Sequence, residues 1–140
     1  MSDAKTKIRT ILTGPQLASF ATVTEDGRPW VRYVVITTDD DLNLRFATYL
    51  ESRKVTQMKK TPHVHVTVGG SMESEGPYLQ IEGAARVTTD QEERNAAWND
   101  MLSKYFQGPE DPNYAIVIVE PSRIEYWSFE SMEPLVWERQ

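Results

Sequence analysis

The chain has 140 residues, 39% of them apolar, and 15 Lys and Arg against 21 Asp and Glu give a net charge of −6. This length suits a single domain over residues 1–140, and the composition excludes collagen, low-complexity disorder and disulfide-rich mini-proteins. Because there is no cysteine, thiol nucleophiles and thiolate-held zinc or iron–sulfur sites are excluded. An acidic chain without an apolar run of about 20 residues favours neither nucleic-acid nor membrane partners, and we expect a cytoplasmic protein.

The first third of the chain predicts a helix followed by a meander of strands. Apolar residues recur at helical spacing over residues 4–13, and Gly14-Pro15 ends the pattern. Short apolar runs separated by turn residues then predict three strands, of which the first two form a hairpin. These strands are expected at 17–24, 30–37 and 42–47.

The rest of the chain predicts further strands and two helices. Residues 52–60 are typical of a short helix that ends before Pro62. Gly83, inside a predicted strand, indicates a bulge or a close backbone approach. Strands are expected at 63–68, 78–87, 114–119, 123–129 after a turn at Pro121-Ser122, and 135–137; a long helix is expected at 91–106, burying Ala97, Trp98, Met101, Leu102 and Tyr105.

Strands joined mostly by short turns favour antiparallel pairing, because parallel strands would need helical crossovers that are missing here. A chain composed mainly of strands must also close or cover its sheet edges. We therefore predict a mainly β fold with peripheral helices, in which a small closed barrel spans about residues 17–129.

Arg32 is the first candidate for a functional residue. It shares a strand face with Trp30, Val34 and Ile36, and this face is predicted to be the interior one. A charge among apolar neighbours needs a partner, because burying it unpaired costs several kcal/mol. The alternative is an arginine at a strand end that reaches water or pairs with an acidic residue.

A second group of cations stands at a predicted helix start. Arg53 and Lys54 follow Ser52 where the helix macrodipole and the free N–H groups prefer an anion. Ser52 suits the N-cap position and its hydroxyl can also donate to a phosphate oxygen. Together with Arg32 these residues suggest a phosphate site, with a solvated basic turn as the alternative.

Other candidates carry less information. The Thr48 hydroxyl, at the mouth of the predicted barrel, could bond a heteroaromatic ring or simply the nearby backbone. His63 and His65 share a strand face at a spacing compatible with a metal, but no third ligand is evident, so no metal site is expected. Neither a nucleophile elbow nor a phosphate loop is present, and no catalytic residue is assigned.

Several segments occur in an order that is typical of one family: residues 32–36, 46–48, 52–54, 79–87 and Trp127. This ordered set, over about residues 17–129, resembles the flavin-binding core of the pyridoxamine 5′-phosphate oxidase-like split barrels. Within that family it resembles the short general stress protein 26-like flavoproteins. The resemblance implies a six-stranded antiparallel split β-barrel that binds FMN.

The resemblance also implies a homodimer with FMN in two clefts at the subunit interface. The residues that it implies as FMN ligands fall into three groups. Arg32, Ser52, Arg53 and Lys54 would hold the phosphate; Tyr33, Val34, Val35 and Thr48 would meet the isoalloxazine ring; Tyr78, Gln80 and Trp127 would approach from the other subunit.

The function implied is that of an oxidoreductase, with hydride passing between FMN and an unidentified small substrate or nicotinamide, in a role related to stress. Two departures argue against vitamin B6 oxidation: Thr37 stands where the oxidase carries a lysine, and no Arg-x-His follows Trp127. The alternatives are a non-catalytic flavin-binding or sensing module, the same barrel carrying deazaflavin or haem, and a structural dimer without a cofactor.

Overall fold

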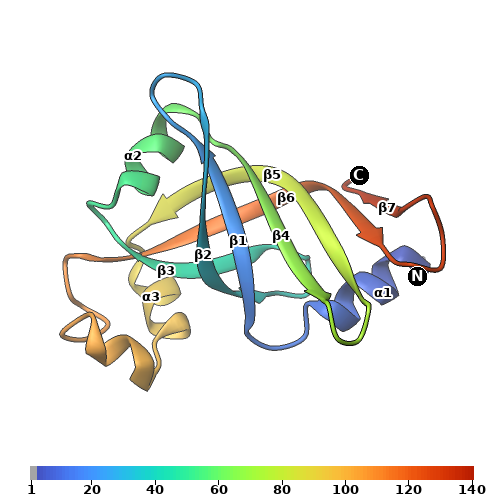
Figure 1. Cartoon of the computed structure of the whole chain (residues 1–140). Coiled ribbons are helices and arrows are strands. Elements are labelled where there is room, and N and C mark those ends of the chain that lie inside the picture. Colours follow the sequence, from blue (N-terminus) through green and yellow to red (C-terminus); the bar gives the residue numbers. More distant parts are fainter. Residues whose placement is uncertain (1–2) are drawn as a thin grey trace.

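The computed structural model describes residues 3–140, which form seven strands, three α-helices and one short 3₁₀ helix (Figure 1). The strands are β1 Gln16–Val23, β2 Pro29–Thr38, β3 Leu44–Tyr49, β4 His63–Ser71, β5 Gly76–Thr88, β6 Tyr114–Trp127 and β7 Leu135–Glu138. The helices are α1 Asp3–Ile11, α2 Arg53–Lys60, α3 Gln91–Ala97 and the 3₁₀ helix η1 Asp100–Lys104. None of these helices is long and apolar enough to cross a lipid bilayer.

The sheet closes on itself because β6 pairs with strands on both of its sides. The strand order is β3-β2-β1-β4-β5-β6-β7, and an additional antiparallel pairing joins β3 to β6. Six strands thus form a closed antiparallel barrel, and β7 extends it beside the second half of β6. The predicted mainly β barrel with peripheral helices is confirmed.

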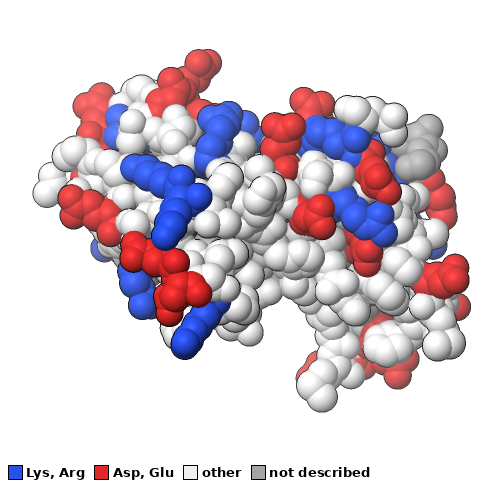
Figure 2. Space-filling model, turned by 90° about the horizontal axis from the view of Figure 1, so that it is seen from above, with Lys and Arg blue, Asp and Glu red and all other residues white. Residues whose placement is uncertain are grey.

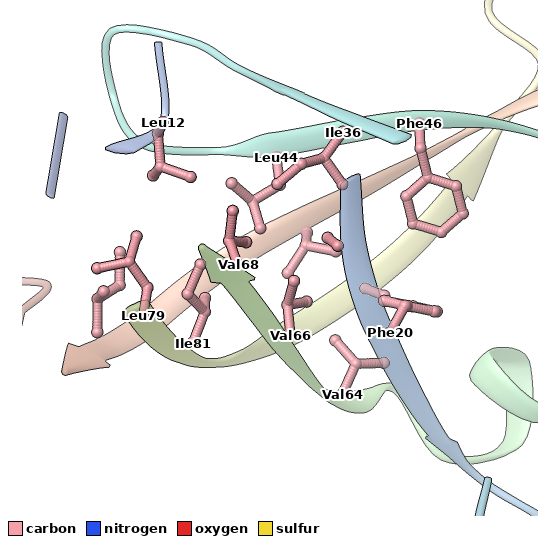
Figure 3. Packing of buried hydrophobic residues seen from close by; sticks show 14 of the residues in the cluster. Leu12, Phe20, Ile36, Leu44, Phe46, Val64, Val66, Val68, Leu79 and Ile81 are labelled. Atoms are coloured by element: carbon pink, nitrogen blue, oxygen red, sulfur yellow. The ribbon is translucent and has the colours of Figure 1, made fainter. Parts of the chain in front are cut away.

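The barrel interior is filled by side chains that alternate along each strand (Figure 3). Val64, Val66 and Val68 on β4 point inward, and each is at most 6% exposed. Phe20 of β1 meets Phe46 of β3 edge to face, with ring centroids 4.9 Å apart. Each such fully buried apolar side chain contributes about 1.5–3 kcal/mol to stability, so the barrel is a rigid support for the residues at its mouth.

The two strands predicted at 114–119 and 123–129 are one continuous strand, β6, so the predicted turn at Pro121 is wrong. Pro121 lies opposite Gly83, where the register between β5 and β6 shifts. A proline fits inside a strand at such a bulge because the ladder there needs no N–H. A Cβ on Gly83 would lie 2.6 Å from the carbonyl oxygen of Glu120, so the predicted close approach is confirmed.

The helix predicted over residues 91–106 is interrupted after α3. Trp98 has extended backbone angles, and the side chain of Asn99 accepts hydrogen bonds from the N–H groups of Met101 and Leu102. An asparagine that bonds the backbone in this way starts a new turn instead of continuing a helix. The predicted burial of Met101 and Tyr105 is therefore wrong, since they are 66% and 60% exposed.

Candidate functional site

A cleft of about 700 Å³ lies between strands β2 and β3 and the α3–η1 segment. This volume is in the range of small-molecule sites. Among the described residues that line the cleft there is no Asp or Glu, although the whole chain is acidic. Six of the predicted FMN ligands line it: Arg32, Tyr33, Val34, Val35, Thr48 and Lys54.

Arg32 is half-buried and is held by neutral groups. Its guanidinium donates to the hydroxyl of Thr22 at 2.6 Å and to the side-chain oxygen of Gln57 at 3.3 Å. Thr22 and Gln57 are themselves buried, on β1 and α2. The Arg32 guanidinium also donates to the carbonyl oxygen of Trp30 at 3.2 Å. These acceptors fix the direction of the guanidinium without neutralising its charge.

Lys54 is held in the same way at the start of α2. Its Nζ donates to the Thr48 hydroxyl at 2.9 Å, and that hydroxyl lies 3.3 Å from the hydroxyl of Ser52. Ser52 occupies the N-cap position, but its side chain makes no capping hydrogen bond. The first N–H groups of α2 therefore have no side-chain cap and remain available to an anion.

The electrostatics show that these cations are not compensated. Burial lowers the pKa of Lys54, and the nearby Arg32 charge lowers it further. Burial likewise lowers the pKa of Arg32, with Arg53 as the second cause. In residues 3–140, no ion pair links any of these three cations to a carboxylate. The arrangement suits a bound anion with several acceptor oxygens, such as a phosphate.

Arg53 lies beside this site and not in the cleft lining. Its guanidinium carbon lies 5.7 Å from the centre of the Trp30 ring. Trp30 is 49% exposed, so its predicted interior position is wrong, because its ring lies over Arg53 at the surface. The predicted interior face of β2 is fully buried at Ile36 and only half-buried at Arg32.

Tyr78, Gln80 and Trp127 are not brought into this cleft within one chain. Tyr78 pairs with Trp127 across β5 and β6, and Gln80 pairs with Glu125. The Trp127 indole N–H donates to Glu125 at 3.1 Å. That these residues reach the cofactor from another subunit stays a prediction.

A further wall of the cleft was not predicted from the sequence. It is formed by Tyr49 of β3 and by Trp98, Met101, Leu102 and Tyr105 around η1. The Tyr49 hydroxyl donates to the Tyr105 carbonyl oxygen at 3.3 Å, which joins β3 to this segment. The signal that could have found the wall is Asn99-Asp100, a helix-breaking pair inside the predicted helix.

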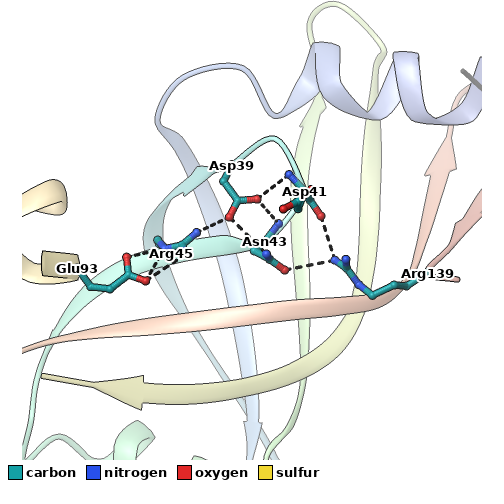
Figure 4. A network of polar contacts seen from close by, with 6 residues as sticks. All are labelled: Asp39, Asp41, Asn43, Arg45, Glu93 and Arg139. Carbon is teal, nitrogen blue, oxygen red and sulfur yellow. Dashed lines mark hydrogen bonds and ion pairs between the residues drawn. The ribbon is translucent and has the colours of Figure 1, made fainter. Parts of the chain in front are cut away.

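Arg45 also lines the cleft, but its charge is already neutralised (Figure 4). Its guanidinium lies 2.6 Å from Asp39 and 3.0 Å from Glu93, and the hydrogen bond to Glu93 is the main cause of its raised pKa. Since Glu93 is on α3, this ion pair attaches the helix to the barrel. Arg139 extends the network by donating to Asn43 at 3.3 Å.

The charged residues that line the cleft differ from those on the face of the molecule seen from above. On that face Lys and Arg are interspersed with Asp and Glu (Figure 2). Among the described residues that line the cleft, the charged ones are all cations. This local excess of positive charge suits a small anion.

The closed six-stranded antiparallel barrel defines the fold of this chain as a split barrel. The profile of the family described as pyridoxamine 5′-phosphate oxidase matches residues 4–128. General stress protein 26 of Bacillus subtilis (strain 168) is 31% identical over 123 residues, which are 87% of this chain and 86% of that protein. The crystal structure of general stress protein 26 from Bacillus anthracis str. Sterne superimposes with a TM-score of 0.83 at 30% identity, covering 96% and 98% of the two chains. The chain belongs to the pyridoxamine 5′-phosphate oxidase family.

Relatives with other names share less with this chain. The pyridoxine/pyridoxamine 5′-phosphate oxidase of Shewanella amazonensis is 31% identical over 104 residues, which are 74% of this chain but 44% of the oxidase. A solved F420 reductase superimposes with a TM-score of 0.65 at 25% identity, covering 83% of this chain and 94% of that one. The fold of this chain is therefore shared by a protein named as an F420 reductase.

Proposed function

We propose that this protein is an FMN-binding flavoprotein that holds the FMN phosphate at Arg32, Lys54 and the start of α2. The observation that carries the proposal is the pair of half-buried cations for which residues 3–140 provide no carboxylate partner. A phosphate would offset their burial and accept charge-assisted hydrogen bonds from both. The hydroxyl of Ser52 and the free N–H groups of α2 supply further donors.

The rest of the cleft fits the isoalloxazine ring. Val34 and Val35 offer apolar surface and backbone groups along β2, and the buried Thr48 offers a hydroxyl between ring and phosphate positions. Bound FMN supplies the hydride-transfer chemistry, exchanging hydride with a small substrate or a nicotinamide. This chain's own residues bind and orient the cofactor and shield it on two sides.

Vitamin B6 phosphate is not the substrate that we propose. Thr37, in place of the lysine of the oxidase, lines the cleft and brings no charge. Arg139, the next arginine after Trp127, donates to the carbonyl oxygen of Pro121 at 2.8 Å and lines a different cavity. The cleft therefore lacks a second set of cations for a second phosphate.

The proposed functional unit is a homodimer that shares two clefts. Leu17, Val31, Tyr33 and Val35 form an apolar stripe across β1 and β2, and each is between 54% and 76% exposed. Exposed apolar stripes of this kind mark interaction surfaces. Because Tyr33 and Val35 also line the cleft, a second copy on this stripe would border the flavin and could present Trp127 to it.

Haem and deazaflavin are the ligands against which the proposal is tested. In the described chain neither His63 nor His65 lines the cleft, so neither is placed as an axial haem ligand there. The F420 reductase shows that the fold also serves a deazaflavin enzyme. Chemical identification of the bound ligand decides between FMN and a deazaflavin.

The test is the visible absorption spectrum of the purified protein, followed by heat release, chromatography and mass determination of the chromophore. We expect FMN at about one equivalent per chain, or its uptake by colourless protein. A protein that is colourless and also ignores added FMN contradicts the proposal. Substrate- or nicotinamide-dependent bleaching of the flavin then separates an oxidoreductase from a module that only binds or senses FMN.

A further inference from the structure

Two parts of the cleft lining differ in chemistry. Arg32 and Lys54, whose charges influence each other, form the cationic part, and the wall around η1 is apolar and aromatic. In residues 3–140, five of the twelve large apolar side chains that are exposed line this one cleft. They are Tyr33, Val35, Tyr49, Met101 and Tyr105.

Ring packing and a hydrogen bond attach the wall to the barrel. The Trp98 ring packs edge to face against the buried Tyr114, with centroids 5.5 Å apart. The Tyr49 ring lies 4.7 Å from that of Phe106, and its hydroxyl donates to the backbone of Tyr105. These contacts fix the rings of Trp98 and Tyr49 and the backbone at Tyr105, so the wall has a defined position on the barrel.

None of the five residues of the wall carries a charge. Among the described residues that line the cleft, the charge that remains besides Arg32 and Lys54 is that of Arg45, and Asp39 and Glu93 neutralise it. A charged group placed against the wall would lose hydration without gaining a counter-charge, which is costly. A flat apolar ring there would instead gain contact with the aromatic side chains.

The cleft offers length for a ring in addition to the flavin phosphate. Its lining follows β2 from Arg32 to Thr37, five residue steps or about 16 Å at the usual rise per strand residue. The residues of the wall line the same cleft of about 700 Å³. A flavin whose phosphate is held at Arg32 would therefore share the cleft with these apolar side chains.

We propose that the wall formed by Tyr49, Trp98, Met101, Leu102 and Tyr105 selects a flat, uncharged aromatic molecule as the partner that binds beside the flavin. This inference rests on the proposed function, because the flavin phosphate must occupy Arg32 and Lys54. It names the substrate class of the site: aromatic and neutral, without the phosphate that vitamin B6 phosphates carry.

The test compares two probes with one ring system, 2-naphthol and 2-naphthalenesulfonate, on the FMN-loaded protein. Saturable change in the visible flavin spectrum reports binding next to the ring. We expect the neutral probe to bind at least tenfold more tightly than the sulfonate. Met101→Lys should reduce this ratio severalfold, since it places a cation on the wall, and Met72→Lys, at a fully exposed position outside the cleft, should leave it unchanged.

The outcomes separate this inference from the proposed function. Protein that carries FMN but binds both probes equally, or prefers the sulfonate, overturns the inference and leaves the flavoprotein intact. Protein that takes up no FMN overturns both. A ratio that Met101→Lys and Met72→Lys change equally would show that the preference does not come from the wall, and would also overturn it.

Discussion

The Lys54 ammonium donates a 2.9 Å hydrogen bond to the hydroxyl of Thr48 and so connects the start of α2 to the buried side of β3. An ammonium has three protons, so two remain for other acceptors. Arg32 is held comparably, by Thr22 and Gln57. Neutral acceptors thus orient both cations while leaving their charge uncompensated, and this is the state in which an anion binds most strongly.

Replacing both cations tests the phosphate site directly. Arg32→Ala combined with Lys54→Ala should weaken FMN binding by more than tenfold, about 1.4 kcal/mol or more, because two charge-assisted hydrogen bonds to phosphate are lost. Titration of the FMN-free protein with FMN, followed by flavin fluorescence, measures the effect. Lys59→Ala, which removes an exposed cation five residues further along α2, is the control. Unchanged affinity in the double variant would refute the assignment.

The uncompensated charge of Lys54 should also make the stability of the FMN-free protein depend on pH. Burial and then Arg32 lower the pKa of Lys54 from its ordinary 10.5, so the folded chain binds this proton less tightly than the unfolded chain. The resulting destabilisation is complete below the folded pKa and disappears as the pH rises toward 10.5. Lys54→Met should therefore stabilise the FMN-free protein at pH 7, by less than about 1 kcal/mol because water still screens the group.

Urea unfolding between pH 7 and 10.5 in phosphate-free buffer measures this difference, which should shrink as the pH rises. Added inorganic phosphate should stabilise the unaltered protein and have little effect on the variant. Lys59→Met serves as the control for loss of a surface charge on the same helix. A Lys54→Met protein that is less stable at pH 7 would contradict the prediction.

The cationic half of the site was predictable because its signals are local. A charge on an inward strand face and two cations at a helix start conflict with ordinary preferences, whatever the rest of the fold. The apolar wall was not predictable in the same way. Met101 and Tyr105 have the helical spacing of buried residues, and only the side-chain cap formed by Asn99 redirects them into the cleft.

The ends of most helices and strands could be predicted from the turn-forming residues beside them. The exceptions have specific causes. The strand predicted from residue 42 begins at residue 44, because Leu42 has a φ of 66° and lies in the turn although it is buried. A proline inside a strand needs a bulge at its pairing position. Since the local sequence around Pro121 shows no such bulge, the residue was interpreted as part of a turn. That pairing with Gly83, 38 positions earlier in the chain, is a tertiary contact that no local pattern contains.

Gly83 should be intolerant of any side chain. Gly83→Ala places a Cβ 2.6 Å from the Glu120 carbonyl oxygen and 3.0 Å from the Pro121 Cα, both backbone atoms that cannot rotate away. We expect the free energy of unfolding to fall by about 1–3 kcal/mol, as for other overpacked sites. Urea unfolding with an unchanged m-value measures the change. Gly108→Ala, where a Cβ meets nothing within 4 Å, is the control, and equal stability of both variants would contradict the bulge geometry.

The shared cleft predicts complementation between two defective chains. Arg32→Ala/Lys54→Ala removes the cations of a cleft, and Trp127→Ala removes the residue proposed to reach it from the other subunit. Each variant alone should bind FMN at least tenfold more weakly than the unaltered protein. In a mixed dimer one cleft combines intact cations from one chain with an intact Trp127 from the other, so one tight site per dimer should return. Differently tagged chains, co-expressed and purified over both tags, allow this site to be counted by FMN titration.

The complementation experiment assumes that the apolar stripe of Leu17, Val31, Tyr33 and Val35 is the dimer interface. Tyr33→Glu puts a charge at a side chain that is 76% exposed in the single chain, so the fold should survive while the dimer dissociates. Light scattering should then give the mass of one chain, whereas Thr56→Glu, at an exposed position of α2 outside the stripe, should keep the mass of two. A stable monomer loaded with FMN, or a mixed dimer without a restored site, would show that each chain builds its cleft alone. In that case Tyr78, Gln80 and Trp127 have no part in binding the flavin.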